Sequence, residues 1–170
     1  MMEKLYPDAW VRSAYDIPYE RLYKKGYRGV LFDIDNTLVP HGAPADDRAK
    51  QLFERLYQTG YACGLISNNR GKRVDMFNEE IHAYTICNAK KPLRESFIKA
   101  SALMGVPADK ILFVGDQIFT DIWGARRSGM YSILVRPVNQ KEVPQVLFKR
   151  PFEKVVLHFY KKHRAKQKKS

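Results

Sequence analysis

Short apolar runs alternate along the chain with longer stretches in which apolar residues recur at helical spacing. The runs at 30–32, 61–66, 84–87, 111–114 and 131–135 predict buried β-strands closed by turn residues. The other stretches predict helices at 19–25, 45–59, 71–82, 93–104 and 120–128. Strands that alternate with helices form βαβ units. We therefore expect an α/β protein of three layers, with a mainly parallel, five-stranded sheet between helices.

The same pattern predicts which side chains are buried. Phe97, Ile98 and Ala102 share one face of the helix at 93–104, which Pro92 can open, and we expect this face to pack on the sheet. Cys63 and Cys87 lie singly in strand-like runs without metal-ligand spacing. We expect both to be buried free thiols.

Two carboxylates stand at the end of the first strand, in the sequence Asp33-Ile34-Asp35-Asn36-Thr37. Because successive strand residues point to opposite faces, Asp33 and Asp35 can point the same way. Neighbouring carboxylates repel each other and are costly to bury unless a cation lies between them. Mg²⁺, which prefers oxygen ligands, is the cation we expect. This stretch alone leaves open an ordinary strand-to-loop turn, where Asp and Asn are common.

Polar residues also follow the ends of the other predicted strands. Ligands of parallel sheets bind outside the carboxyl ends of the strands, so we expect these residues to meet at one site. They are Ser67 and Asn68 after the second strand, Lys90 and Lys91 after the third, and Asp116 and Asp121 after the fourth. Asn68, Asn69 and Arg70 can contact a substrate or only shape their turn, and His41 can lie near the site without a catalytic role.

Taken in order, these segments resemble the four motifs of the haloacid dehalogenase (HAD) superfamily of phosphotransferases. Asp-x-Asp-x-Thr corresponds to residues 33–37, and the strand-end Ser to Ser67. The motif Lys corresponds to Lys91, directly before a proline, better than to Lys90. Gly-Asp-x-x-x-Thr-Asp corresponds to residues 115–121. The resemblance covers about two-thirds of the chain and implies the HAD-like Rossmannoid fold.

The resemblance also implies a chemistry, that of a phosphatase that uses Mg²⁺ and an aspartyl-phosphate intermediate. Asp33 would be the nucleophile, and Asp35 would protonate the leaving oxygen and then activate water. Lys91 would offset the charge of Asp33 and of the phosphoryl group. Mg²⁺ would be bound by Asp33, by Asp116 and by the backbone carbonyl of Asp35, while Asp121 would orient Lys91 or act through water. The substrate-binding residues would be Thr37, Ser67 and Asn68.

The spacing of the motifs leaves no room for a substantial cap domain. Only 29 residues separate Thr37 from Ser67 and 23 separate Ser67 from Lys91, and each gap holds one helix and one strand. Cap-less members of the superfamily tend to act on large substrates. The segments LFDIDNTLVP, ISNN, AKKP and VGDQIFTDIWGARRSGM further resemble subclass IIIA, YqeG-type phosphatases, which are related to phosphatidylglycerophosphate phosphatases. This finer resemblance implies hydrolysis of phosphatidylglycerophosphate to phosphatidylglycerol.

The net charge of +12 is concentrated at the C-terminus. Residues 149–170 hold nine Lys or Arg and one acid, so this segment carries +8. Phe152, Val155, Val156 and Phe159 recur there at helical spacing, which predicts a basic amphipathic helix. Its apolar face can rest on an anionic membrane or pack on the protein's own core, and the pattern leaves both open. Nucleic acid is the less favoured partner, because few aromatic residues lie among the last basic ones.

Residues 1–28 form an arm with six Tyr or Trp residues, which can pack on the domain or rest on a membrane interface. We thus expect three parts, namely this arm, a HAD-like core at 29–148 and a basic helix at 149–170. No apolar run approaches the ~20 residues of a membrane span, and the start has no signal-peptide core. We expect a cytoplasmic protein, peripheral at the membrane face if the tail binds lipid. The alternatives are a soluble nucleotide or sugar phosphatase and an RNA- or ribosome-associated protein with a phosphatase core.

Overall fold

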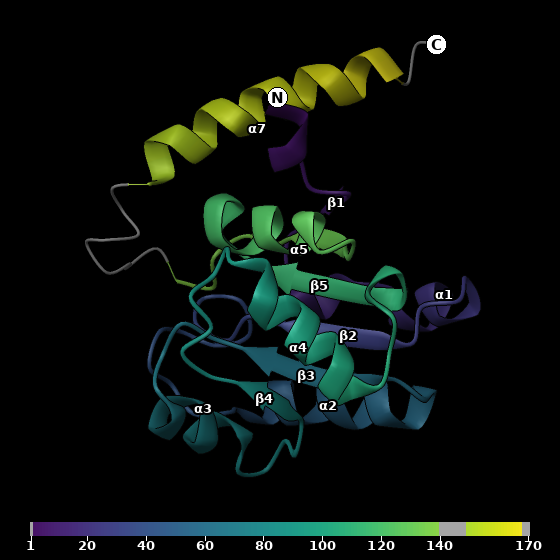
Figure 1. Cartoon of the computed structure of the whole chain (residues 1–170), viewed down its shortest axis with the longest axis vertical. Coiled ribbons are helices and arrows are strands. Elements are labelled where there is room, and N and C mark those ends of the chain that lie inside the picture. The colour runs from purple at the N-terminus through teal and green to yellow at the C-terminus, as the bar shows by residue number, and fades with distance from the viewer. Residues whose placement is uncertain (1, 140–148, 168–170) are drawn as a thin grey trace.

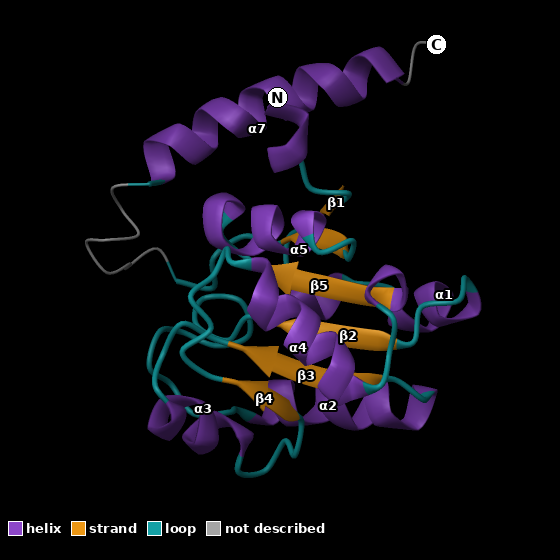
Figure 2. Cartoon of the chain, viewed as in Figure 1, coloured by secondary structure: helices purple, strands orange, loops and turns teal. Residues whose placement is uncertain are grey.

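The computed structural model of the chain describes residues 2–139 and 149–167. This described part is built on one sheet of six parallel strands with helices on both faces (Figures 1 and 2). In spatial order the strands are β1 (Ala9–Trp10), β6 (Tyr131–Leu134), β5 (Ile111–Gly115), β2 (Gly29–Phe32), β3 (Ala62–Ile66) and β4 (Tyr84–Ile86). The predicted α/β class is confirmed. The predicted boundary at residue 148 and the basic residues Lys168 and Lys169 lie outside the described residues.

The sheet has one strand more than the five that the sequence pattern predicted. The additional strand, β1, comes from the aromatic arm and pairs in parallel with β6. Just before it, the Asp8 carboxylate accepts hydrogen bonds from the backbone amide and the hydroxyl of Ser132, both at 2.8 Å. A strand of two residues next to Pro7 is too short to show as an apolar run, so only the fold reveals it.

Helices cover both faces of the sheet within the described residues, and α7 (Arg150–Gln167) packs at the end of the molecule away from β4. The helices are α1 (Tyr19–Lys24), α2 (Asp47–Thr59), α3 (Gly71–Asn78), α4 (Arg94–Met104), α5 (Trp123–Arg127) and α7, with short helical turns η1 (Met2–Leu5), η2 (Ala14–Asp16), η3 (Ala108–Lys110) and η4 (Ile118–Ile122). One helix, α2 or α3, fills each of the two connections in which a cap could be inserted. The prediction that the fold has no substantial cap is confirmed for the described part of the chain.

Some predicted helix limits were wrong, and local hydrogen bonds explain them. The helix predicted to start at 45 starts later because Asp46 is its N-cap, with Oδ1 accepting from the Ala49 amide at 2.8 Å. The helix predicted to reach 82 ends at Asn78, whose side chain bonds both the amide and the carbonyl of Ala83. The helix predicted over 120–128 begins as the wide π-type turn η4 and continues as α5.

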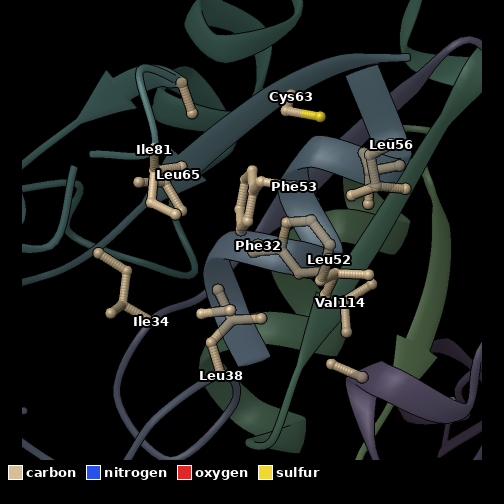
Figure 3. Close-up of a cluster of buried hydrophobic side chains, with 14 of the residues drawn as sticks. Phe32, Ile34, Leu38, Leu52, Phe53, Leu56, Cys63, Leu65, Ile81 and Val114 are labelled. Carbon is tan, nitrogen blue, oxygen red and sulfur yellow. The ribbon is translucent and has the colours of Figure 1, made fainter. Parts of the chain in front are cut away.

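Strand residues alternate between two hydrophobic layers. On one side, Phe32 packs with Phe53 and other side chains of α2 (Figure 3). On the other side, Leu31 belongs to the layer formed with α4 and α5. The layers consist of buried residues such as Val30, Phe32, Leu52, Phe53, Leu56 and Leu65 in the first, and Leu31, Ile66, Phe97, Ala100, Met104 and Phe113 in the second. A strand that is buried on both faces has no polar face, which is why the strands show as continuous apolar runs.

The burial of α4 and of one cysteine differs from the prediction. Phe97 is buried, but Ile98 and Ala102 are exposed, and the buried stripe continues through Ala100 and Met104 instead. The stripe therefore runs at intervals of three and four residues from Phe97. Cys63 is a buried free thiol as predicted, whereas Cys87 is a free thiol that is exposed because β4 ends one residue before it.

Helix α7 and residues 2–10 of the aromatic arm form a third packed region at the end of the molecule away from β4 (Figure 1). Val156 of α7 is buried with Ile118 and Ile122 of η4 and with Leu134 of β6. The ring of Tyr160 contacts the rings of Tyr6 and Trp10, at centroid distances of 5.6 and 6.4 Å. The arm thus packs on the domain, with its start against α7 and its later residues in the first hydrophobic layer. No described helix combines the length and the apolar character that crossing a bilayer requires.

Candidate active site

The polar residues at the strand ends gather at one edge of the sheet. β2 runs directly into Asp33, whose backbone amide donates to the Val114 carbonyl of β5 at 2.9 Å. Asn36 then turns the chain with a left-handed backbone, at a φ of 63°. This edge opens into a pocket of about 190 Å³. Its lining residues are Asp33, Asp35, Asn36, His41, Ser67, Asn68, Asn69, Lys91, Gln117, Thr120 and Lys149.

Lys91 lies between two buried carboxylates. Its Nζ donates to Asp33 Oδ1 and to Asp121 Oδ1, in both cases at 2.6 Å. Burial disfavours the ammonium, but the carboxylates of Asp121 and Asp33 outweigh burial and raise the pKa of Lys91. Burial raises the pKa of Asp33 to about 7, and Lys91 opposes that shift while Asp121 adds to it. Lys91 is therefore a fixed positive charge beside Asp33, whereas its neighbour Lys90 is exposed.

Oxygen donors converge beside this pair. One carboxylate oxygen each of Asp33, Asp116 and Asp121 lies within 4.8 Å of the others, and all three residues are buried. The hydroxyl of Thr37 lies 3.0 Å from Asp33 Oδ2 and 3.4 Å from Asp116 Oδ1. Burial, together with the charges of Asp33 and Asp121, raises the pKa of Asp116 well above its usual range. Buried carboxylates in excess of the nearby cations fit a hard divalent cation such as Mg²⁺.

Hydrogen bonds to both of its oxygens hold the Asp121 carboxylate beside Lys91. Oδ1 accepts from Lys91, and Oδ2 accepts from the Gln117 amide at 3.1 Å. Asp121 packs directly against Gly115, where a Cβ would lie 2.6 Å from the Asp121 Cβ and 2.7 Å from its Cγ. Glycine at the end of β5 thus lets Asp121 reach Lys91, and this arrangement suits an orienting role.

Asp35 lines the same pocket but has different partners. Its Oδ1 accepts from the Gly42 amide at 2.8 Å and from Arg73 Nη2 at 2.9 Å, and its Oδ2 accepts from Asn69 Nδ2 at 2.6 Å. His41 Nδ1 lies 3.8 Å from Oδ1, so this histidine is near the site. These groups fix the orientation of the Asp35 carboxylate at the pocket wall. The three-carboxylate cluster described above does not include the Asp35 side chain.

The residues after β3 shape the loop opposite Asp33. Ser67 is buried, and its Oγ accepts from the Asn69 amide at 3.0 Å, which leaves the hydroxyl proton for another acceptor. Asn68 Oδ1 accepts from the backbone amide of Lys91 at 2.7 Å. Asn68 therefore helps to position the loop that carries Lys91, in addition to lining the pocket.

Two arginines that the sequence pattern did not single out, Arg73 and Arg150, reach the site. Arg73 lies in the first turns of α3, which follows the carboxyl end of β3, and this placement is a signal that could have found it. Arg150 opens α7, and its Nη2 donates to Asp116 Oδ2 at 2.6 Å. No sequence spacing marks Arg150, because it lies 34 positions after Asp116.

Comparisons with known proteins agree with this geometry. The family model described as HAD-hydrolase-like matches residues 88–143. The Bacillus subtilis (strain 168) protein named Probable phosphatase YqeG is 32% identical over 164 residues, and the alignment covers 95% of each chain. The chain belongs to the YqeG-type phosphatases of the HAD superfamily. The resemblance found from the motifs is confirmed.

This YqeG-type phosphatase is also similar to a more distant relative and to a solved structure. Phosphatidylglycerophosphate phosphatase 1, chloroplastic/mitochondrial, of Arabidopsis thaliana is 26% identical over 157 residues, covering 83% of this chain and 43% of that protein. A solved structure of an uncharacterized protein from Listeria monocytogenes serotype 4b has a TM-score of 0.54 at 16% identity, covering 69% of this chain and 85% of that one. The structural likeness supports the fold.

Proposed function

We propose that this HAD phosphatase is a Mg²⁺-dependent phosphomonoesterase that forms an aspartyl-phosphate on Asp33. The observation that carries the proposal is the pair of polar groups on that carboxylate. The Lys91 ammonium engages one oxygen at 2.6 Å, and the Thr37 hydroxyl lies 3.0 Å from the other. A carboxylate held in this way, next to a fixed positive charge, suits attack on an anionic phosphoryl group.

The reaction follows from the side chains around the pocket. A carboxylate oxygen of Asp33 attacks phosphorus, and the bond between phosphorus and the alcohol oxygen breaks. Asp35 gives its proton to that oxygen. Water then attacks the phosphorus of the aspartyl-phosphate, Asp35 takes the proton of this water, and Asp33 leaves as a free carboxylate with inorganic phosphate as the product. Asn69, Arg73 and the Gly42 amide keep Asp35 oriented for both proton transfers.

Other groups bind and neutralise the phosphoryl oxygens. Asp33, Asp116 and the backbone carbonyl of Asp35 would hold Mg²⁺, which when bound neutralises negative charge on the transferred group. Lys91 supplies a second positive charge, and Asp121 keeps its ammonium in place. Ser67 and Asn68 line the pocket and offer a hydroxyl proton and an amide group to phosphoryl oxygens.

We propose phosphatidylglycerophosphate as the substrate and phosphatidylglycerol as the product. The name of the Arabidopsis relative supports this choice, as does a pocket with no cap over it in the described part of the chain. The residue before α7, Lys149, lines the pocket, so the basic C-terminal helix begins at the site. A lipid phosphatase needs such an open site beside a surface that can rest on the bilayer.

Helix α7 supports the lipid proposal through its two different faces. Its inner face, with Val156 and Tyr160, is buried at 4% and 6% exposure. On its outer face Phe152, Val155 and Phe159 are 58%, 53% and 42% exposed. Exposed basic residues follow on the same helix, namely Lys161, Lys162, Arg164 and Lys166. An exposed apolar stripe with basic residues suits an anionic lipid surface, where each Lys or Arg contributes about 1 kcal/mol.

Flotation with vesicles tests this docking face. We expect the protein to float with vesicles of phosphatidylglycerol and phosphatidylcholine, and less with phosphatidylcholine alone. The double variant Val155→Glu/Phe159→Glu should lose flotation, whereas Leu103→Glu, at an exposed leucine of α4, should keep it. Equal flotation of the double variant and the wild type would reject this face. Salt-sensitive RNA binding without flotation would favour the nucleic-acid alternative.

Phosphate release tests the proposed reaction. Purified protein with Mg²⁺ should release phosphate from phosphatidylglycerophosphate, and Asp33→Asn should abolish the release. Mass spectrometry of quenched enzyme should find a phosphoryl group on Asp33 of the wild type. A phosphoryl group on another residue, or full activity of Asp33→Asn, would overturn the assignment of the nucleophile.

A further inference from the structure

The first turn of α7 is bonded to Asp116, the residue directly after β5. Arg150 Nη2 donates to the Asp116 carboxylate, at 2.6 Å from Oδ2, and Arg150 Nη1 donates to the backbone carbonyl of the same residue at 2.9 Å. The planar guanidinium thus bonds the main chain and the side chain of Asp116 together. Arginine keeps its charge at all accessible pH values and presents its donors in a rigid fork. The contact therefore restricts how the Asp116 carboxylate can rotate.

A buried glutamate one turn further along α7, Glu153, holds the Arg150 guanidinium in place. Glu153 is 4% exposed, and its Oε2 accepts from Arg150 Nη1 at 2.7 Å. Its Oε1 accepts from the Ile118 amide, also at 2.7 Å. A buried carboxylate is stable only when its oxygens have such partners. Arg150 and Glu153 together connect α7 to the segment after β5, because they bond Asp116 and Ile118, the residues on either side of Gln117.

The bond from Arg150 engages only one oxygen of the Asp116 carboxylate, and the other oxygen is directed to the proposed metal position. Oδ2 is engaged by Arg150, whereas Oδ1 lies 3.4 Å from the Thr37 hydroxyl. The same hydroxyl lies 3.0 Å from Asp33 Oδ2. Asp116 Oδ1 and Asp33 Oδ2 therefore face the same small region, from which a cation could contact both.

The position of α7 itself comes from hydrophobic packing. Val156 packs with Ile118 and Ile122, and Tyr160 packs against Tyr6 and Trp10 of the N-terminal arm. The arm and α7, at opposite ends of the sequence, together set where Arg150 lies. The start of the aromatic arm and the C-terminal helix thus position a side chain that contacts the site.

We propose that Arg150, held by Glu153, is a positioning residue that orients Asp116 for Mg²⁺. The inference rests on the Mg²⁺ binding proposed above. For the loss of Arg150, the inference predicts a change in Mg²⁺ affinity opposite to the one that charge alone predicts. Removing a positive charge next to a metal site should tighten cation binding if charge alone mattered. If Arg150 positions Asp116, removing it weakens binding, because the carboxylate is then free to turn away from the metal.

Calorimetric titration with Mg²⁺ tests the proposal without any substrate. Arg150→Met should weaken Mg²⁺ binding by about 10-fold to 100-fold, in the range found when groups that orient metal ligands are removed. Arg150→Lys keeps the charge but not the fork, so it should also weaken binding, though less than Arg150→Met. Glu153→Gln should act in the same direction. Lys154→Met, which removes an exposed charge from the same turn, should bind Mg²⁺ as the wild type does.

The outcomes separate this inference from the proposed function. Unchanged or tighter Mg²⁺ binding by Arg150→Met would overturn the positioning role while the wild type still binds the metal. A wild type that binds no Mg²⁺ would instead overturn the proposed function. If Arg150→Met fails to fold, Arg150→Lys decides, because it keeps the positive charge and removes only the fork, so wild-type Mg²⁺ affinity in Arg150→Lys would overturn the role. For each folded variant, activity should recover at saturating Mg²⁺, as expected when affinity rather than the chemical step is affected.

Discussion

Lys91 and Asp33 are 58 residues apart in the chain, yet the Lys91 ammonium lies 2.6 Å from the Asp33 carboxylate. The pair is buried, with side-chain exposures of 4% and 9%. A buried charge without its partner is strongly destabilising, so neither residue can be changed without affecting the other. This contact joins the ends of β2 and β4 and makes the pocket a single chemical unit.

Replacing Lys91 should therefore damage both activity and stability. In Lys91→Met, Asp33 and Asp121 lose their shared cation, which we expect to cost about 3–5 kcal/mol of unfolding free energy. Turnover should fall by about 10²-fold to 10³-fold, because the charge beside the transferred phosphoryl group is lost. Urea unfolding and phosphate release measure the two effects. Lys90→Met removes the exposed neighbouring lysine and should leave both near wild type; equal losses in the two variants would contradict the assignment.

Adding one methyl group at Gly115 should displace Asp121. The new Cβ would lie 2.6–2.7 Å from Asp121 atoms, so Asp121 has to move away from Lys91. We expect Gly115→Ala to destabilise the fold by about 1–3 kcal/mol and to reduce turnover. Gly71→Ala is the matched control, because its Cβ would meet nothing closer than 3.7 Å. Wild-type turnover in Gly115→Ala would show that the placement of Asp121 is not needed.

Arg73 should matter for the proton transfers of Asp35. Its Nη2 lies 2.9 Å from Asp35 Oδ1, and loss of this contact leaves the carboxylate less well oriented. We expect Arg73→Met to lower kcat by about 10²-fold, a size typical of a misplaced catalytic group. Lys72→Met, at an exposed residue of the same helix, should leave kcat unchanged. Steady-state kinetics of both variants test this, and similar kcat values for Arg73→Met and Lys72→Met would show that Arg73 does not orient Asp35 for catalysis.

Mg²⁺ should stabilise the protein more at higher pH. Burial raises the pKa of Asp33 to about 7, so in the metal-free protein the folded state holds a proton that the unfolded state releases. That stabilisation is fully present below the unfolded pKa and is lost as pH rises through about 7. Bound Mg²⁺ replaces the proton. The rise in Tm on adding Mg²⁺ should thus be larger at about pH 8 than at about pH 6. A larger rise at the lower pH would contradict this reasoning.

Residues at strand ends were predictable because a parallel sheet brings them to one edge. Asp33, Lys91 and Asp116 could be assigned to one site from their order along the chain, since each follows a readable apolar run. Gly115 also belonged to the motif, although its contact with Asp121 appears only in the structure. The roles of these residues stay predictions until the variants are measured.

Features that depend on distant packing were not predictable. β1 has only two residues, and its pairing with β6 joins segments more than 120 residues apart. Arg150 belonged, in sequence, to a basic tail, and nothing local distinguished it from its basic neighbours. The pattern on α7 did not say which of its apolar residues pack inward, and the structure divides them into a buried Val156 and exposed Val155 and Phe159.

The measurement that tests the central claim most directly compares kcat/KM for phosphatidylglycerophosphate in mixed micelles with that for soluble sugar and nucleotide phosphates. Both assays contain Mg²⁺ and are repeated with Asp33→Asn. We predict a clear preference for the lipid and no turnover of any substrate by Asp33→Asn. Efficient hydrolysis of a soluble phosphomonoester, with none of the lipid, would contradict the lipid function and favour a soluble nucleotide or sugar phosphatase.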